Sequence, residues 1–406
     1  MVRLEAESWA GGGRAVARTE GKVWFVAGAL PGEVVEAEVE RQRAGIVEAR
    51  TVSVLRASGE RERQPCPVVG TCGGCDLGHV APGAVAKALR AAVIGALRHA
   101  PPELAERVAQ ARIVPSPPRW RLRARLHWDP ATESLGFLGL RSHTVVRIDP
   151  CRVVSARLLD LLPALERALA AVRAPAGEVE WLEDLAGEAA LAGWRGRLDL
   201  PRIGGLAGWW SLGRGAGSHL EGWGENGVTM RLPVPLWVPL GAFFQGNRHL
   251  TPLLFDRVGG LVAESRCTRV VDLYGGVGLL AAGAHWAGAR EVTVVEPSGM
   301  AARAAARNLP DCRVFADSAE RFLIAPPPAR GTLAILDPPR IGLSAEVRAQ
   351  LARWEPDRLL MLSCDAARFG RDAADLISAE YVLDGLELWD LFSGSHHVEI
   401  LASFAR

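Results

Sequence analysis

The stretch Val-Val-Asp-Leu-Tyr-Gly-Gly-Val-Gly, residues 270–278, decides the fold of the C-terminal part of the chain. A short apolar run ends at the carboxylate of Asp272, and three glycines follow within six residues. This pattern predicts a buried strand that passes through a tight turn into a helix. Glycines at such a turn let the backbone approach a ligand closely. A tight turn that binds nothing is the alternative.

Three further apolar runs follow, at residues 292–296, 333–337 and 359–363, and Ala- and Arg-rich stretches of helical composition separate them. Apolar strands that alternate with helices predict an α/β fold with a doubly wound parallel sheet. In such sheets, ligands bind at the carboxyl ends of the strands, so the polar residues there are candidate site residues. They are Asp272, Glu296, Asp337 and Cys364.

Glu296 lies 24 residues after Asp272, at the end of the next predicted strand. A carboxylate at this place can accept both hydroxyls of a ribose, which indicates a nucleoside-type cofactor. The glycine turn departs from the G-x-G-x-x-G pattern of NAD sites. We therefore favour S-adenosylmethionine, which has no pyrophosphate to bind. Asp337 begins Asp-Pro-Pro-Arg and predicts a rigid loop whose carboxylate faces the same pocket, with a helix-capping aspartate as the alternative.

Two residues are candidates for chemistry. Cys364 follows an apolar strand at the expected ligand edge and could act as a nucleophile, or it could be an inert buried cysteine. Glu399 stands in His397-Val398-Glu399 beside an apolar run, where an unpaired carboxylate is costly. It could be a general base or a member of an ordinary ion pair. Residues 243–247, Phe-Phe-Gln-Gly-Asn, could contact a base and a cofactor, or plug a domain junction.

A cysteine cluster lies in the first third of the chain. Cys66, Cys72 and Cys75 fall within ten residues, and Cys151 could supply a fourth thiolate. Four thiolates suit zinc or a [4Fe–4S] cluster, and the spacing alone slightly favours zinc as the commoner ion. Free buried thiols are the third possibility.

The rest of the composition is that of an ordinary globular protein. The chain has 406 residues, 49% hydrophobic and 23% charged, with a net charge of +1, which excludes a mostly disordered chain. No run approaches the roughly 20 apolar residues of a membrane span. Residues 1–58 read as a small β module that fits a five-stranded OB-type barrel, and residues 81–106 as helical. Residues 111–157 contain nine arginines against three acidic residues, a local basic patch suited to phosphates.

Taken together and in this order, the motifs resemble the RNA uracil-5-methyltransferase family, in particular its TRAM-domain, iron–sulfur-containing 23S rRNA members. The resemblance covers nearly the whole chain. It implies an OB-like RNA-binding TRAM domain over residues 1–58, a central α+β iron–sulfur domain over 59–240, and a Rossmann-like methyltransferase domain over 241–406. The helix near 81–106 is expected to pack on the catalytic domain.

The resemblance also implies roles for individual residues. Cys364 matches the nucleophile and Glu399 the general base. For the cysteine cluster, the resemblance implies a [4Fe–4S] cluster rather than zinc, with Cys66, Cys72, Cys75 and Cys151 as ligands. Residues matching the cofactor-binding motifs are Gln245, Tyr274, Gly276, Gly278, Glu296 and Asp337, together with Asp317 or Ser318.

The implied activity is S-adenosylmethionine-dependent methylation of carbon 5 of uridine in RNA, with 23S rRNA preferred and the T-loop of tRNA as the alternative substrate. The chain departs from the family pattern at Gly275, where Cys is frequent, at Leu279 and at Asp365. A non-catalytic RNA-binding iron–sulfur protein and an exocyclic-amine methyltransferase are the competing functions. We expect a cytoplasmic monomer that binds RNA and no membrane.

Overall fold

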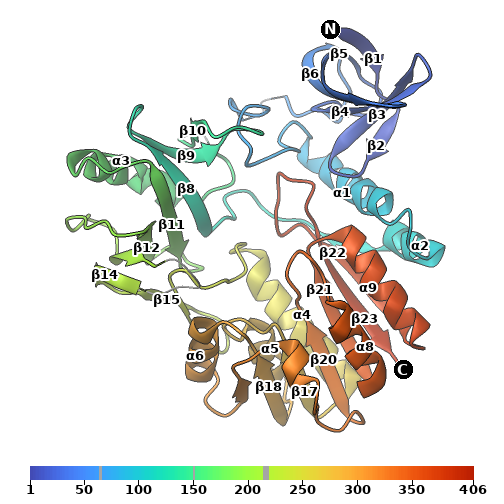
Figure 1. Cartoon of the computed structure of the whole chain (residues 1–406), viewed down its shortest axis with the longest axis vertical. Coiled ribbons are helices and arrows are strands. Elements are labelled where there is room, and N and C mark those ends of the chain that lie inside the picture. Colours follow the sequence, from blue (N-terminus) through green and yellow to red (C-terminus); the bar gives the residue numbers. More distant parts are fainter. Residues whose placement is uncertain (64–65, 150, 214–218) are drawn as a thin grey trace.

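The computed structural model describes residues 1–63, 66–149, 151–213 and 219–406 (Figure 1). The N-terminal part is a six-stranded sheet in the order β1-β5-β6-β4-β3-β2. Three of its strands, β4, β5 and β6, contain β-rich runs at residues 23–26, 34–39 and 46–54. The others have weaker signals, because β1 and β2 are four and three residues long and β3 has an apolar run of only three residues. The sheet therefore has six strands, one more than the five expected from the sequence. The bounds are β1 (Val2–Glu5), β2 (Ser8–Ala10), β3 (Arg14–Thr19), β4 (Lys22–Ala27), β5 (Val34–Arg43) and β6 (Ile46–Arg56).

The segment predicted as one helical stretch is two helices, α1 (Pro82–Ala96) and α2 (Pro102–Gln110). The break falls at Pro101-Pro102, because proline cannot continue a helix but suits its first turn. Their apolar faces share one core with α9 (Ala366–Ser378), so the helices pack on the C-terminal sheet. Figure 1 shows α1 between the N-terminal sheet and α9. A short strand, β7 (Arg112–Val114), then joins the C-terminal sheet.

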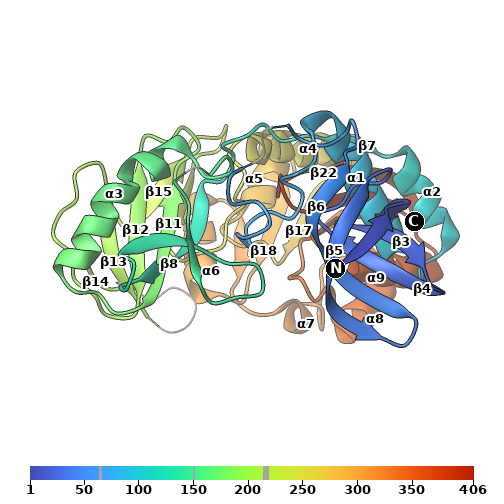
Figure 2. The same ribbon diagram turned by 90° about the horizontal axis from the view of Figure 1, so that it is seen from above.

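The central part is a seven-stranded sheet, in the order β10-β9-β8-β11-β12-β13-β14, backed by α3 (Ala156–Ala171). Figure 2 shows it beside the rest of the molecule. Its core is built around the buried side chains of Trp128, Trp181 and Trp209. The strands are β8 (Arg123–Asp129), β9 (Ser134–Leu138), β10 (Val145–Arg147), β11 (Gly177–Glu183), β12 (Ala190–Arg195), β13 (Gly208–Leu212) and β14 (His219–Gly224), followed by the hairpin β15 (Gly227–Met230) and β16 (Leu236–Pro239).

The arginines of the predicted basic patch mostly have partners within the chain. Arg125 forms an ion pair with Glu180 at 3.2 Å, and Arg147 pairs with Glu166 at 2.9 Å. The guanidinium of Arg121 stacks on an aromatic ring at 4.8 Å. These three side chains therefore have partners within the chain.

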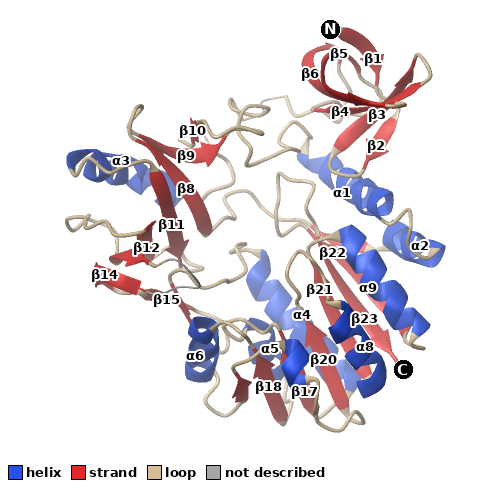
Figure 3. Cartoon of the chain, in the orientation of Figure 1, coloured by secondary structure: helices blue, strands red, loops and turns tan. Residues whose placement is uncertain are grey.

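The C-terminal part confirms the predicted α/β fold. Its sheet has the order β19-β18-β17-β20-β21-β23-β22-β7, and β17 to β21 are parallel. In the core, α4 and α5 cover one face, and α8 and α9 cover the other (Figure 3). The strands are β17 (Arg269–Leu273), β18 (Glu291–Val295), β19 (Arg313–Phe315), β20 (Thr332–Leu336), β21 (Arg358–Ser363), β22 (Val382–Trp389) and β23 (Glu399–Ala405). The helices, besides α9, are α4 (Leu250–Ser265), α5 (Leu279–Trp286), α6 (Gly299–Asn308), α7 (Ala319–Phe322) and α8 (Ala345–Trp354).

The register of this sheet brings the candidate residues to one edge. Leu273 is level with Val295 on one side and with Leu336 on the other. Glu296 and Asp337 directly follow these strand ends, so the predicted carboxylates lie around the same edge. Within the described part of the chain, no helix is long and apolar enough to cross a membrane.

Candidate active site

The glycine turn after β17 adopts a backbone that few residues tolerate. Tyr274, Gly276 and Gly278 have positive φ angles of 65°, 57° and 95°. Gly275 has no room for a side chain, because a Cβ there would lie 2.7 Å from Cγ1 of Val294. The turn leads directly into α5, as the sequence predicts.

Two carboxylates accept hydrogen bonds from the backbone of this turn and of the helix that follows it. Glu296 accepts the backbone N–H of Gly276 through Oε2 at 2.9 Å and that of Ser298 through Oε1 at 2.7 Å. Asp272 is fully buried, and its Oδ2 accepts the N–H of Ala281 at 3.0 Å. Its Oδ1 has no hydrogen-bond partner. Burial, with Asp337 as the second cause, raises the pKa of Asp272 well above its usual value. A cation bound here would stabilise the ionised form.

A small pocket of about 30 Å³ lies over the turn. Gln245, from the segment before α4, donates its amide to Oδ2 of Asp337 at 3.4 Å. Burial raises the pKa of Asp337 to about 7, and the bond from Gln245 opposes this shift. Four of the predicted cofactor residues therefore line one pocket, whereas Gly278 and Glu296 do not; Glu296 binds the backbone of Gly276, which does. The four are Gln245, Tyr274, Gly276 and Asp337.

Asp317 and Ser318 lie beyond β19 and do not line this pocket. Asp317 forms an ion pair with Arg321 at 3.0 Å. The hydroxyl of Ser318 caps α7 by accepting the backbone N–H of Arg321 at 3.4 Å. Both side chains have structural partners in this state of the protein.

Cys364 and Glu399 meet at the end of the sheet. Ser363, the last residue of β21, pairs with Ile400 in the antiparallel ladder with β23. The next position of this register sets Cys364 opposite Glu399. Burial, with the charge of Glu399 as the second cause, raises the pKa of Cys364 to about 12. Glu399 is 3% exposed, and burial followed by Asp337 raises its pKa well above the usual value.

Arg340 is a functional candidate that sequence reasoning treated only as part of a rigid loop. Its positive charge lowers the pKa of both Cys364 and Glu399, opposing the effect of burial. Its position three residues after Asp337, at a strand end, is the sequence signal that could have identified it.

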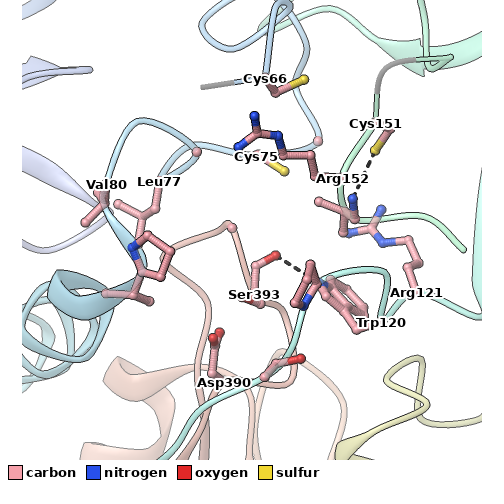
Figure 4. A pocket seen from close by; sticks show the side chains of 18 of the residues that line it. Cys66, Cys75, Leu77, Val80, Trp120, Arg121, Cys151, Arg152, Asp390 and Ser393 are labelled. Atoms are coloured by element: carbon pink, nitrogen blue, oxygen red, sulfur yellow. Dashed lines mark hydrogen bonds between the residues drawn. The ribbon is translucent and has the colours of Figure 1, made fainter. Parts of the chain in front are cut away.

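The four cysteines of the predicted cluster line a single cavity of about 600 Å³. Figure 4 shows Cys66, Cys75 and Cys151 around it. The backbone N–H of Gly74 donates to Sγ of Cys72 at 3.3 Å, and a similar bond reaches Cys151 from Val153 at 3.4 Å. In the described residues, no three His, Cys, Asp or Glu side chains are arranged closely enough to hold a metal ion.

The chain has close relatives of known name. Residues 2–52 match the TRAM domain family. A protein of Pseudomonas putida named 23S rRNA (uracil(1939)-C(5))-methyltransferase RlmD is 34% identical over 99% of this chain and 93% of its own length. A protein of the same name from Halomonas elongata is 31% identical over 95% of this chain and 86% of its own length.

One solved structure resembles this chain over its full length. The tRNA (uracil-54, C5)-methyltransferase of Pyrococcus abyssi, solved in complex with S-adenosyl-L-homocysteine, aligns over the full length of both chains with a TM-score of 0.78 and 20% identity. At that identity, the match supports the fold. The relatives in sequence settle the family: the chain belongs to the RNA (uracil-C5)-methyltransferases, alongside the 23S rRNA enzymes named RlmD.

Proposed function

We propose that this protein methylates carbon 5 of a uridine in 23S rRNA, at the site named for its relatives, with S-adenosylmethionine as methyl donor. The observation that carries the proposal is the placement of Cys364 opposite Glu399, beside the pocket of Asp337. A thiol and a carboxylate at one strand edge are the two groups that this reaction requires.

The chemistry explains the need for both groups. Carbon 5 of uracil is a weak nucleophile, so the thiolate of Cys364 adds to carbon 6 and makes carbon 5 an enolate carbon. S-adenosylmethionine supplies the methyl group that carbon 5 receives. Glu399 then removes the proton from carbon 5, and the Sγ–C6 bond breaks to release the thiolate. The uridine must leave its base stack to reach these residues.

The polar groups around Cys364 determine its reactivity. Because burial holds the pKa of its thiol at about 12, the thiolate needs a positive neighbour, and Arg340 is the cation that lowers this pKa. Arg340 is exposed, so it can also contact the RNA. We assign it the role of stabilising the thiolate at the start of the reaction.

We further propose that the cysteine cavity holds a [4Fe–4S] cluster. The donor types suit such a cluster, because Cys66, Cys72, Cys75 and Cys151 all line one cavity and backbone N–H groups donate to two of the sulfurs. Residues 66–75 and 151 come from distant segments, so a cluster would join them. Iron and sulfide analysis of anaerobically prepared protein tests this: about four irons per chain are expected, and one zinc would contradict it.

The TRAM domain and the central domain are proposed to bind the RNA. We place their boundaries at residues 1–58 and 59–240, with the catalytic domain at 241–406, although α1, α2 and β7 pack on the catalytic sheet. The enzyme would act as a monomer in the cytoplasm, where rRNA is processed. For the cofactor, we keep Gln245, Tyr274, Gly276, Gly278, Glu296 and Asp337, with Asp317 or Ser318 as a further contact.

The experiment is methylation of unmodified transcripts. The purified protein is incubated with methyl-labelled S-adenosylmethionine and with either 23S rRNA or tRNA, and the digested RNA is analysed for 5-methyluridine by mass spectrometry. We expect labelled 5-methyluridine at one 23S position and none with Cys364→Ala. Labelling of the tRNA T-loop alone would replace the proposed substrate, and labelled N-methylated bases would refute the chemistry.

A further inference from the structure

In the loop between β22 and β23, His396 forms a residue pair with Asp76 of the cysteine loop. The backbone N–H of His396 donates to Oδ1 of Asp76 at 2.7 Å, and the His396 ring forms a second contact with Oδ2 of the same carboxylate. Asp76 directly follows Cys75. The pair therefore joins two segments that lie 320 residues apart in the chain.

The surrounding contacts leave this loop little freedom. The N–H of Leu77 donates to the carbonyl of Gly394 at 2.9 Å. Gly394 has a φ of +91°, and a Cβ there would lie 3.1 Å from Sγ of Cys75. The Nε1–H of Trp120 donates to the carbonyl of Ser393 at 3.1 Å, as Figure 4 shows.

The N-terminal domain also lies next to His396. A Cβ on Gly13, in the turn between β2 and β3, would lie 3.0 Å from Cβ of His396. The His396 ring also packs on the ring of His397, with centroids 4.2 Å apart. His396 thus lies against both the cysteine loop and the turn between β2 and β3.

The loop between β22 and β23 leads directly to Glu399, the proposed general base. His396 precedes Glu399 by three residues, and Glu399 is the first residue of β23. The nucleophile Cys364 follows a different strand, β21. A shift of the loop would therefore move the carboxylate relative to the thiol that must be expelled.

We propose that Asp76 and His396 are a positioning pair that fixes Glu399 for the elimination step of the reaction. The inference rests on the proposed function. A base acts only within hydrogen-bond reach of its proton, and a misplacement of about 1 Å can cost about 10²-fold in rate. Addition of Cys364 and methyl transfer use groups outside this loop. Loss of the pair should slow elimination and leave the earlier steps intact.

The test uses Asp76→Ala, His396→Ala and the double variant, all in full-length protein prepared anaerobically. Turnover on the 23S transcript should fall by about 10- to 10²-fold with KM for RNA unchanged. Methyl-labelled RNA should become covalently attached to the protein and remain so on a denaturing gel. The double variant should be no slower than either single variant, because the two side chains act as one unit.

Two control variants separate positioning from general stability. Asp76→Asn keeps an acceptor for the N–H of His396 and should recover most of the turnover. Glu60→Ala removes an ion pair to Lys87 of 2.8 Å, and the Glu60 side chain is 34% exposed against 35% for Asp76. This variant should turn over like the wild type.

Three results would contradict the pair's role. One is a fall in turnover without a labelled covalent band, one is an equal loss in Glu60→Ala, and one is a loss of iron from Asp76→Ala that accounts for its slower turnover. If the wild type does not methylate RNA at all, the proposed function fails instead, since that result does not involve the pair.

Discussion

The affinity for S-adenosylmethionine should rise with pH between pH 6 and pH 8. Burial raises the pKa of Asp337 to about 7, and the pocket beside it also contains the buried Asp272. The methyl donor carries a positively charged sulfonium. A cation in this pocket favours the ionised carboxylate, so binding releases a proton and becomes tighter as pH rises.

The size of the effect follows from the pKa. A carboxyl group with a pKa near 7 is about 90% protonated at pH 6 and about 10% at pH 8. If the cation binds only the ionised form of Asp337, Kd falls about tenfold over this range, or about 1.4 kcal/mol. S-adenosylhomocysteine lacks the sulfonium charge, so its Kd should change less.

Isothermal titration calorimetry at pH 6, 7 and 8, in two buffers of different ionisation enthalpy, measures both the affinity and the protons released. Asp337→Asn should bind with a Kd that changes much less with pH. Asp390→Asn is the matched control: burial raises the pKa of Asp390 to about 7 as well, but this residue lines the other cavity. A flat or falling affinity in the wild type would refute the reasoning.

Three further predictions concern packing and charge. Gly275→Ala should lower the free energy of unfolding by about 1–3 kcal/mol in urea titrations, because its Cβ would lie 2.7 Å from Val294; wild-type stability would contradict this. For Asp390, the raised folded-state pKa means that its stability contribution is full below about pH 4 and is lost as pH rises through about 7. The wild type should therefore lose up to about 4 kcal/mol from this group by pH 8, and the decline in Asp390→Asn should be smaller by about that amount. Arg340→Gln should slow alkylation of Cys364 by iodoacetamide at pH 8, since Arg340 lowers the pKa of the thiol, and an unchanged rate would remove Arg340 from this role.

The C-terminal fold was predictable because its strands are short, continuous apolar runs that end in polar residues. β17, β18, β20 and β21 all fall on such runs. The first strands of the N-terminal domain were not predicted, because β1 and β2 each bury a single residue and the buried run of β3 is only three residues long. The break between α1 and α2 was overlooked although Pro101-Pro102 signals it.

The candidate site was predictable residue by residue but not as a geometry. Polar residues at strand ends identified Asp337 and Cys364, whereas the placement of Cys364 opposite Glu399 depends on the antiparallel return of β23. Sequence periodicity contains no information on that pairing. The pairing of Asp76 with His396 spans 320 residues and likewise has no local signal. Clustered arginines suggested phosphate binding, but charge composition cannot show which arginines have acidic partners.

The central claim is that Cys364 and Glu399 serve successive steps of one reaction. Two variants, Glu399→Gln and Cys364→Ala, are each incubated with 23S rRNA and methyl-labelled S-adenosylmethionine and run on a denaturing gel. Glu399→Gln keeps the nucleophile and the methyl transfer but loses the base, which typically contributes about 10²–10⁴ in rate, so a methyl-labelled protein–RNA band should persist. Cys364→Ala should give no such band and no product. Normal turnover by both variants, or a covalent band without Cys364, would contradict the account.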